Sequence, residues 1–269
     1  ALEVARCALQ NGAEVLGVAR IEEGIRIREA GIEVPILIFG STLPDLSAKL
    51  LDYDLTQTVY TYASAQVLSQ TAISMKKKIK LHLKIDTGMG RLGLLPQNFQ
   101  QGNSIGISAD AIEESLAIAG LNGLELEGIF THFATADSAD KTYAEIQLDL
   151  FMNFLNRLRK AGLEPPVRHA ANSAALIDMP QSHLDMVRPG IASYGLYPSD
   201  EVNKKHVPLK PAMALKARII HLKKVPAGFK VSYGSPHQTP TATTIATIPV
   251  GYADGLNRLL SSRGQMLVH

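Results

Sequence analysis

The sequence predicts an α/β fold, with a (β/α)8 barrel followed by a second domain rich in β structure. Over most of the chain, short apolar runs alternate with longer amphipathic runs, which is typical of parallel strands joined by helices. After residue 205 this alternation gives way to runs of Val, Ile and Thr interrupted by six prolines, which indicates β structure. We therefore expect a barrel domain over residues 1–205 and the start of a β domain over residues 206–269.

Each strand candidate is a short run of apolar and β-branched residues, and each helix candidate has apolar residues three and four apart. The runs EVLGVA and PILIFG illustrate the strands, and Leu148, Phe151, Leu155 and Leu158 mark one face of the longest helix. In chain order the predicted elements are helix 1–9, strand 14–19, helix 21–30, strand 35–40, helix 46–51, strand 56–61, helix 63–77, strand 79–86, helix 109–119, strand 126–133, helix 143–161, strand 167–171, a short helix around 174 and strand 186–189.

The two ends of this pattern look incomplete. Seven strands are predicted where a (β/α)8 barrel needs eight, and the first element is a helix with no strand before it. The final run, residues 265–269, stops without a turn signal. We therefore expect the first barrel strand to precede Ala1 and the β domain to be cut short.

Composition excludes several functional classes. The net charge is +2, and the densest basic run, residues 76–78, ends a helical pattern without interleaved aromatic residues, so we expect no nucleic-acid partner. The single Cys7 excludes an internal disulfide framework and a cysteine-rich zinc site, and we expect it to be a small buried residue. No apolar stretch approaches the roughly 20 residues that span a bilayer. These features predict a cytoplasmic protein with no structural metal and no membrane partner.

The predicted strand 79–86 carries polar side chains on one face. Its apolar residues alternate with four polar ones, whereas barrel interiors are normally packed with branched apolar residues. A binding site inside the barrel and a satisfied internal Lys/Asp pair both account for this pattern. The four polar residues are Lys80, His82, Lys84 and Asp86.

Two short motifs at the end of this strand point to other chemistry. Residues 88–93, GMGRLG, fit the dinucleotide fingerprint G-x-G-x-x-G, but that fingerprint must open a helix and Pro96 follows almost at once. Residues 86–88, DTG, match the aspartic protease motif, whose fold is all-β. The α/β pattern argues against both.

Candidate ligand-binding groups follow three successive predicted strands. Barrel enzymes place functional groups at the carboxyl ends of their strands and often bind phosphate near the last of them. The same residues are also explained without a ligand, as an ordinary helix cap and a structural histidine. The candidates are His132, His169, Asn172, Ser173, Arg188, Gly190 and Ile191.

Six motifs, taken in order along the chain, resemble consecutive signatures of alanine racemases. Each is weak alone, but together they span essentially the whole chain. They are LKIDTGMGRLG (83–93), GIFTHFATAD (128–137), RHAANSAA (168–175), MVRPGIASYGLYP (186–198), VSYG (231–234) and IPVGYADG (248–255).

The resemblance implies an enzyme that uses pyridoxal 5'-phosphate to interconvert L-alanine and D-alanine, supplying D-alanine for peptidoglycan. The family joins an N-terminal barrel to a C-terminal β domain and works as a head-to-tail homodimer whose active sites use residues of both subunits. It implies a two-base mechanism in which one base removes the α-proton and another returns a proton to the opposite face of the α-carbon.

By position, the resemblance gives roles to single residues. Tyr233 matches the base on one face of the substrate, with His132 as its partner, and Tyr252 matches a residue where the substrate enters. Lys84 matches a lysine that is often carbamylated in the family and orients the arginine matching Arg91, which contacts the cofactor hydroxyl and the substrate carboxylate.

The remaining matched residues bind the cofactor. Arg188 matches the arginine that faces the pyridine nitrogen, with His169 as its partner. Because arginine does not give up its proton, the ring nitrogen stays unprotonated and the carbanion short-lived, which favours racemisation over transamination. The phosphate and its surroundings are matched by Asn172, Ser173, Gly190 and Ile191.

The family's cofactor-binding lysine lies in a motif similar to VKANAYGHG, and no segment of this chain matches it. We therefore expect an internal fragment with little or no racemase activity by itself. Two other readings stay open: a barrel-type pyridoxal-phosphate amino-acid decarboxylase and a non-catalytic pyridoxal-phosphate carrier. A decarboxylase normally places an acid where Arg188 lies, and a carrier consists of the barrel alone, so Arg188 and the β segment after residue 205 argue against them.

Overall fold

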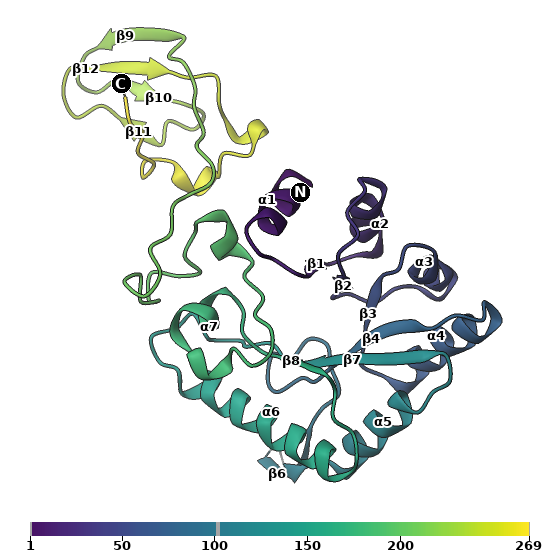
Figure 1. The fold of residues 1–269 in the computed structure, drawn as a ribbon. Helices are drawn as coiled ribbons and strands as arrows, with labels where there is room; N and C mark the ends of the chain where they lie inside the picture. Colours follow the sequence, from purple (N-terminus) through teal and green to yellow (C-terminus); the bar gives the residue numbers. More distant parts are fainter. Residues whose placement is uncertain (1, 101–102, 269) are drawn as a thin grey trace. The chain divides into compact units, whose positions relative to one another are not determined.

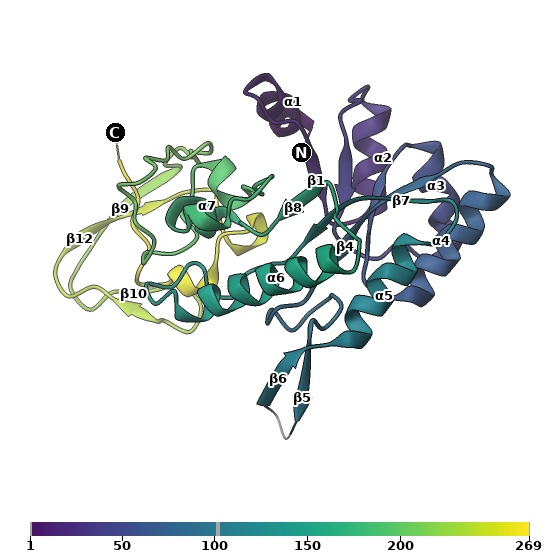
Figure 2. The same cartoon turned by 60° about the horizontal axis from the view of Figure 1, so that its bottom comes forward.

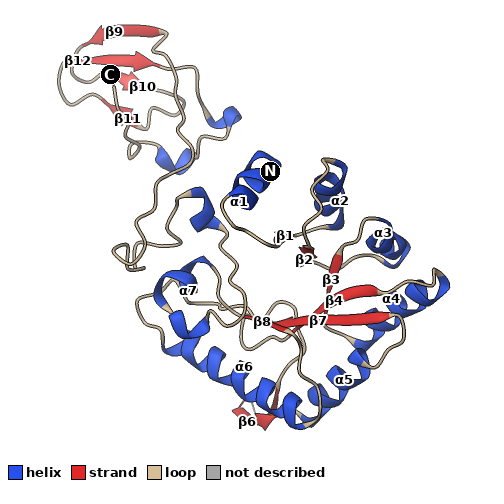
Figure 3. Cartoon of the chain, in the orientation of Figure 1, coloured by secondary structure: helices blue, strands red, loops and turns tan. Residues whose placement is uncertain are grey.

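The chain folds as two compact units, residues 1–212 and residues 213–269. The computed structural model describes residues 2–100 and 103–268. In the first unit helices alternate with strands, and the second unit consists of short strands, loops and single turns of helix (Figure 3). The sequence placed the boundary at 205/206, which lies within the first of these units.

The first unit is built on a parallel sheet of six strands, ordered β1-β2-β3-β4-β7-β8. Each strand pairs in parallel with the next in this order, and the curved sheet carries helices on its outer side (Figure 1). This arrangement is part of a (β/α)8 barrel wall, as predicted. The strands are β1 Leu16–Val18, β2 Ile36–Ile38, β3 Thr56–Val59, β4 Ile79–Lys84, β7 Leu124–Phe130 and β8 Val167–His169.

The helices bury one face against this sheet. In α6 the side chains of Phe151, Phe154 and Leu158 are fully buried, and each such side chain contributes roughly 1.5–3 kcal/mol by leaving water. The helices are α1 Leu2–Gln10, α2 Ile21–Glu29, α3 Ser47–Asp52, α4 Tyr62–Ser74, α5 Ala109–Ala119, α6 Thr142–Lys160 and α7 Ser173–Asp178, with 3-10 turns η1 Pro44–Leu46, η2 Pro180–Ser182 and η3 Ile191–Tyr194.

Two predictions about strands were wrong. The run 186–189 forms no strand: a single parallel bridge joins Met186 to His169, and Pro189, which has no N–H to donate, leads into η3. An antiparallel hairpin was missed, formed by β5 Gln97–Gln100 and β6 Asn103–Ile107 and projecting from the first unit (Figure 2). Its sequence is polar and lacks the apolar alternation that marks a strand.

Cys7 is exposed on α1, so the prediction of a buried cysteine was also wrong. Only Ala5 is buried among the described residues of this helix, because its contact with the core is narrow. None of the helices described within residues 2–100 and 103–268 combines the length and apolar character needed to cross a membrane.

The second unit is β-rich, as predicted. Strands β9 and β12 pair antiparallel, and so do β10 and β11. Its elements are β9 His221–Val225, β10 Lys230–Val231, β11 His237–Gln238, β12 Thr243–Thr247 and the 3-10 turns η4 Tyr252–Asp254 and η5 Arg258–Leu260.

Arg28, near the end of α2, ties two turns of the first unit together. Its guanidinium donates to the carbonyl oxygens of Ile32 and Val34 at 2.7 Å each and to those of Tyr53 and Asp54 at 2.8 Å each. Removing this charged donor would leave several of the four carbonyl oxygens without a hydrogen-bond partner.

Arg28→Ala should therefore lower the free energy of unfolding by about 2–3 kcal/mol, measured by urea denaturation. Arg26→Ala is the matched control, because Arg26 is exposed on the same helix and should change the free energy by less than about 0.5 kcal/mol. Equal losses in the two variants would contradict this role for Arg28.

Candidate active site

A cavity of about 340 Å³ lies at the carboxyl ends of the parallel strands. Ligands bind at this end of parallel sheets, because the loops that follow the strands converge there. Four residues singled out from the sequence, Lys84, Arg91, His132 and Arg188, line this cavity. The rest of its wall consists of Ala19, Phe39, Gly40, Leu92 and Phe130.

The guanidinium of Arg188 is held by four acceptors. Nη2 donates to the carbonyl oxygens of Thr131 and Ala170 at 2.8 Å each, and it contacts Nδ1 of His132 at 3.3 Å. Nη1 contacts Nδ1 of His169 at 2.6 Å, the pairing that the sequence led us to expect. Burial lowers the pKa of Arg188 to about 9, so the group stays protonated at neutral pH.

The two histidines beside Arg188 are neutral. Burial is the main cause and the positive charge of Arg188 the second, and together they lower the pKa of His132 to about 4 and that of His169 well below 6.5. Since a guanidinium only donates, each imidazole offers the lone pair of its Nδ1. Arg188 is thus a cation surrounded by four hydrogen-bond acceptors, the two carbonyl oxygens and the two Nδ1 atoms.

Lys84 is a buried amine in positively charged surroundings. Its side chain lies at the end of β4, 4% exposed, with Nζ 5.1 Å from the centre of the Phe130 ring. Burial lowers its pKa to about 8, and the charges of Arg91 and Arg188 act in the same direction, whereas Asp86 opposes them. At neutral pH a share of this amine is therefore neutral and nucleophilic.

Asp86 organises the loop that carries Arg91. One carboxylate oxygen accepts the backbone N–H groups of Gly88, Met89 and Gly90 at 2.8–3.0 Å, and the other accepts that of Arg91 at 2.9 Å. The loop forms no helix, which agrees with the rejection of a dinucleotide site at GMGRLG. Asp86 therefore positions Arg91 and takes no part in an acid pair.

A second group of predicted residues meets where α7 and η3 begin. The hydroxyl oxygen of Ser173 accepts the N–H groups of Gly190 at 2.8 Å and Ala192 at 3.3 Å. No described residue accepts the N–H of Ile191 between them. The side-chain oxygen of Asn172 caps α7 by accepting the N–H groups of Ala174 and Ala175, the helix-cap alternative noted from the sequence. This arrangement offers an anion the hydroxyl hydrogen of Ser173 and the N–H of Ile191.

Tyr233 and Tyr252 belong to the second unit. Tyr233 is 93% exposed in the turn between β10 and β11, and Tyr252 is 68% exposed at the start of η4. The turn around Tyr233 has left-handed backbone at Ser232 (φ 68°) and Ser235 (φ 51°). Such conformations cost of order 1 kcal/mol or more and are common where a side chain must be presented for function.

Sequence reasoning missed the contact made by His82, which lies two residues before Lys84. Its Nδ1 is 2.8 Å from Nε2 of His169, and both rings are buried. The alternation along the strand placed His82 on the same face as Lys84, which was the available signal. The alternation did not indicate which side chain of another strand His82 would contact.

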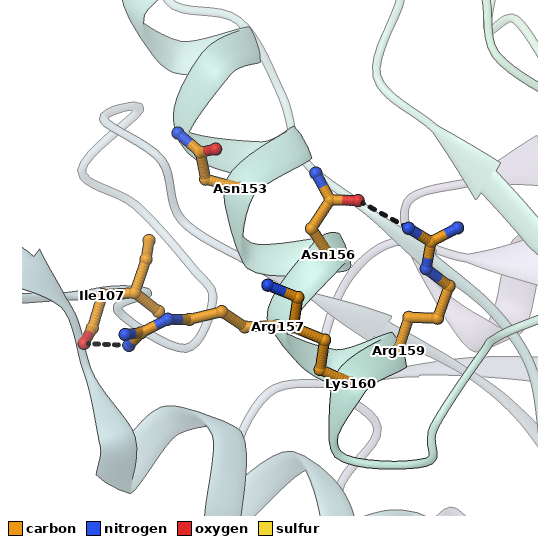
Figure 4. Close-up of a pocket in the computed structure, with 6 residues that line it drawn as sticks. All are labelled: Ile107, Asn153, Asn156, Arg157, Arg159 and Lys160. Atoms are coloured by element: carbon orange, nitrogen blue, oxygen red, sulfur yellow. Dashed lines mark hydrogen bonds between the residues drawn. The ribbon is translucent and has the colours of Figure 1, made fainter.

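A larger cavity, about 550 Å³, lies against the last turns of α6 (Figure 4). Arg157 donates to the carbonyl oxygen of Ile107, and Arg159 donates to Asn156. The polar residues around this cavity are exposed, and each belongs to the solvent-facing side of the helix. It is therefore an ordinary polar helix surface. The remaining lining residues are Asn153 and Lys160.

Both units match known protein families. The model of the alanine racemase N-terminal domain matches residues 1–198, and that of the alanine racemase C-terminal domain matches residues 212–269. An alanine racemase of Desulfosudis oleivorans is 54% identical over 266 residues, which cover 99% of this chain and 67% of that protein.

Solved structures agree with these matches. The alanine racemase of Clostridium difficile 630 has a TM-score of 0.84 at 40% identity, covering 96% of this chain and 64% of that one. The alanine racemase of Streptomyces coelicolor A3(2) has a TM-score of 0.87 at 34% identity, covering 98% and 68%. This chain spans about two thirds of the length of these relatives. The chain belongs to the alanine racemase family.

Proposed function

We propose that this chain provides the pyridoxal 5'-phosphate site and one of the two proton-transfer bases for the interconversion of L-alanine and D-alanine. The observation that carries the proposal is Arg188, a half-buried cation fixed by two carbonyls and two neutral histidines at the wall of the cavity. A decarboxylase or a carrier is not favoured, because the relatives of this chain are alanine racemases along both units.

The residues present fit the cofactor. The Nε–H of Arg188 has no acceptor among the described residues, so it is available to the lone pair of a pyridine nitrogen. The hydroxyl hydrogen of Ser173 and the N–H of Ile191 suit a phosphate, next to Gly190, whose N–H is held by Ser173, and Asn172 fixes the start of the helix. When bound, pyridoxal phosphate withdraws electrons from the substrate α-carbon and so acidifies its α-proton.

Arg188 sets how far this acidification goes. Because it remains a cation at neutral pH and has only donors, it cannot leave its proton on the ring nitrogen. Negative charge at the α-carbon is then less delocalised, and the carbon is reprotonated quickly. This favours racemisation over transamination.

Tyr233 is proposed as the base that serves one face of the α-carbon, and it acts in a site that a second subunit completes. The Nε2–H of His132 is free to donate to a phenol oxygen, because its Nδ1 already accepts from Arg188. Arg91 would bind the substrate carboxylate, and Tyr252 would lie where the substrate enters. We infer a cytoplasmic homodimer whose product serves peptidoglycan synthesis.

Lys84 is proposed to carry a carbamate. Its neutral amine attacks CO2, the new N–C bond forms and one proton leaves to solvent, so a cation becomes an anion between Arg91 and Arg188. With a pKa of about 8, about a tenth of the amine is neutral at pH 7, roughly 300-fold more than for an ordinary lysine.

Incubation with 13C-labelled bicarbonate should therefore give a carbamate signal in the NMR spectrum. At fixed dissolved CO2 the signal should grow from about pH 6 to pH 8, because the neutral fraction rises through a pKa of about 8. Lys84→Arg should abolish it. Lys80→Arg is the control on the same strand, where Lys80 pairs with Asp54 at 3.1 Å, and should keep it. A signal that survives Lys84→Arg would contradict the assignment.

Chiral analysis of alanine tests the proposed function. A full-length protein that contains this chain, supplied with pyridoxal phosphate and L-alanine, should produce D-alanine until the two enantiomers are equal. Release of CO2 would favour a decarboxylase, and cofactor binding without turnover would favour a carrier.

A further inference from the structure

Three side chains form a line leading away from the cavity: the half-buried Arg188 and the buried His169 and His82. The distances are 2.6 Å from Nη1 of Arg188 to Nδ1 of His169 and 2.8 Å from Nε2 of His169 to Nδ1 of His82. His169 is fully buried and His82 is 6% exposed. The line therefore joins β4 to β8 across β7, and neither histidine is among the residues that line the cavity.

The direction of both hydrogen bonds follows from the chemistry of the groups. Arg188 only donates, so Nδ1 of His169 accepts. A neutral imidazole with a lone pair on Nδ1 carries its proton on Nε2, so His169 donates to His82. Nδ1 of His82 then accepts, and its own proton lies on Nε2. Each ring is held in one tautomer.

The surrounding residues leave the rings little freedom. A Cβ at Gly128 would lie 2.6 Å from Cε1 of His82 and 2.8 Å from the carbonyl oxygen of Val167, so a glycine is needed for His82 to reach across β7. The ring of His169 stacks on that of Phe130, with centres 4.6 Å apart and planes 9° apart. The residues of the sheet thus fix the positions of the two imidazole rings.

We propose that His82 is a positioning residue, which accepts the Nε2 proton of His169 and thereby keeps the Nδ1 lone pair of His169 aimed at Arg188. Without this acceptor, the Nε2–H of His169 is buried and unpaired, so this tautomer and orientation lose their advantage and the ring can turn or exchange between tautomers. The effect on catalysis rests on the proposed function, because the orientation of Arg188 matters where it faces the cofactor nitrogen.

Two substitutions of nearly equal shape separate this role from simple packing. His82→Asn places a carbonyl oxygen close to the position of Nδ1 and can still accept, whereas His82→Leu cannot. In 15N NMR spectra of the full-length protein, Nδ1 of His169 should be unprotonated in the unsubstituted protein and in His82→Asn. In His82→Leu the His169 signals should change tautomer or show exchange between tautomers.

Turnover provides the second readout. By analogy with the outer hydrogen-bond partners of metal ligands, His82→Leu should lower kcat by about 10- to 100-fold, and His82→Asn should restore most of it. A protonated Nδ1 on His169 in the unsubstituted protein would overturn the proposal, and so would equal turnover in the two variants. If the unsubstituted protein fails to racemise alanine, the proposed function is wrong, while the tautomer measurement still tests the line of hydrogen bonds.

Discussion

Replacing Arg188 with lysine should lower kcat/KM for alanine racemisation by about 100- to 1,000-fold, the loss expected when a fixed donor is removed from a reacting site. A lysine ammonium is a compact point charge on a flexible stem, so it cannot span the Thr131 and Ala170 carbonyls, reach His169 and also face a ring nitrogen. Because lysine keeps the positive charge, a loss of kcat/KM in this variant reflects the lost hydrogen-bond geometry of the guanidinium. Steady-state kinetics in both directions measure it.

Arg168→Lys is the matched control. Arg168 lies one residue before His169 on β8 and pairs with Asp185 at 2.7 Å, and both side chains are more than one third exposed. An exposed pair of this kind contributes little, so kcat/KM should stay close to that of the unsubstituted protein. A comparable loss in both variants would mean that the Arg188 effect reflects general disturbance of the sheet.

Tyr233→Phe should reduce turnover by about 1,000-fold or more, because a positioned acid or base contributes roughly 100- to 10,000-fold. In D2O the α-proton of L-alanine should no longer exchange with solvent. The α-proton of D-alanine, which faces the other base, should continue to exchange. NMR of the two enantiomers with the full-length protein measures both rates.

Tyr53→Phe removes a phenol from the end of α3 and is the control, with exchange of both enantiomers expected to continue. The asymmetry between enantiomers is what separates a base from a residue that merely shapes the site. Unimpaired exchange of L-alanine in Tyr233→Phe would remove Tyr233 from its proposed role.

Much of the fold could be predicted because the spacing of apolar residues along the sequence indicates which side chains are buried. The helices around residues 109–119 and 143–161 lie within one residue of their predicted bounds, because their apolar faces cover the sheet. The β5–β6 hairpin was missed because backbone pairing forms it without an apolar pattern. The strand expected at 186–189 fails because Pro189 ends the pairing after a single bridge.

The location of the site could be predicted from the sequence, but the contacts between its side chains were harder to predict. Parallel strands end on one side, so Lys84, His132 and Arg188 could be expected to meet at one cavity. The contact of His82 with His169 depends on Gly128 leaving room between them, which no pattern within one strand reveals. The roles given to Tyr233 and Tyr252 remain predictions.

The central claim is that Arg188 faces the cofactor nitrogen and leaves it unprotonated. It is tested most directly by 15N NMR of pyridoxal phosphate labelled at the ring nitrogen and bound to a full-length protein that contains this chain. We predict the signal of an unprotonated nitrogen that accepts a hydrogen bond, shifting when Arg188 is replaced by lysine. The signal of a protonated pyridinium at neutral pH would contradict the account.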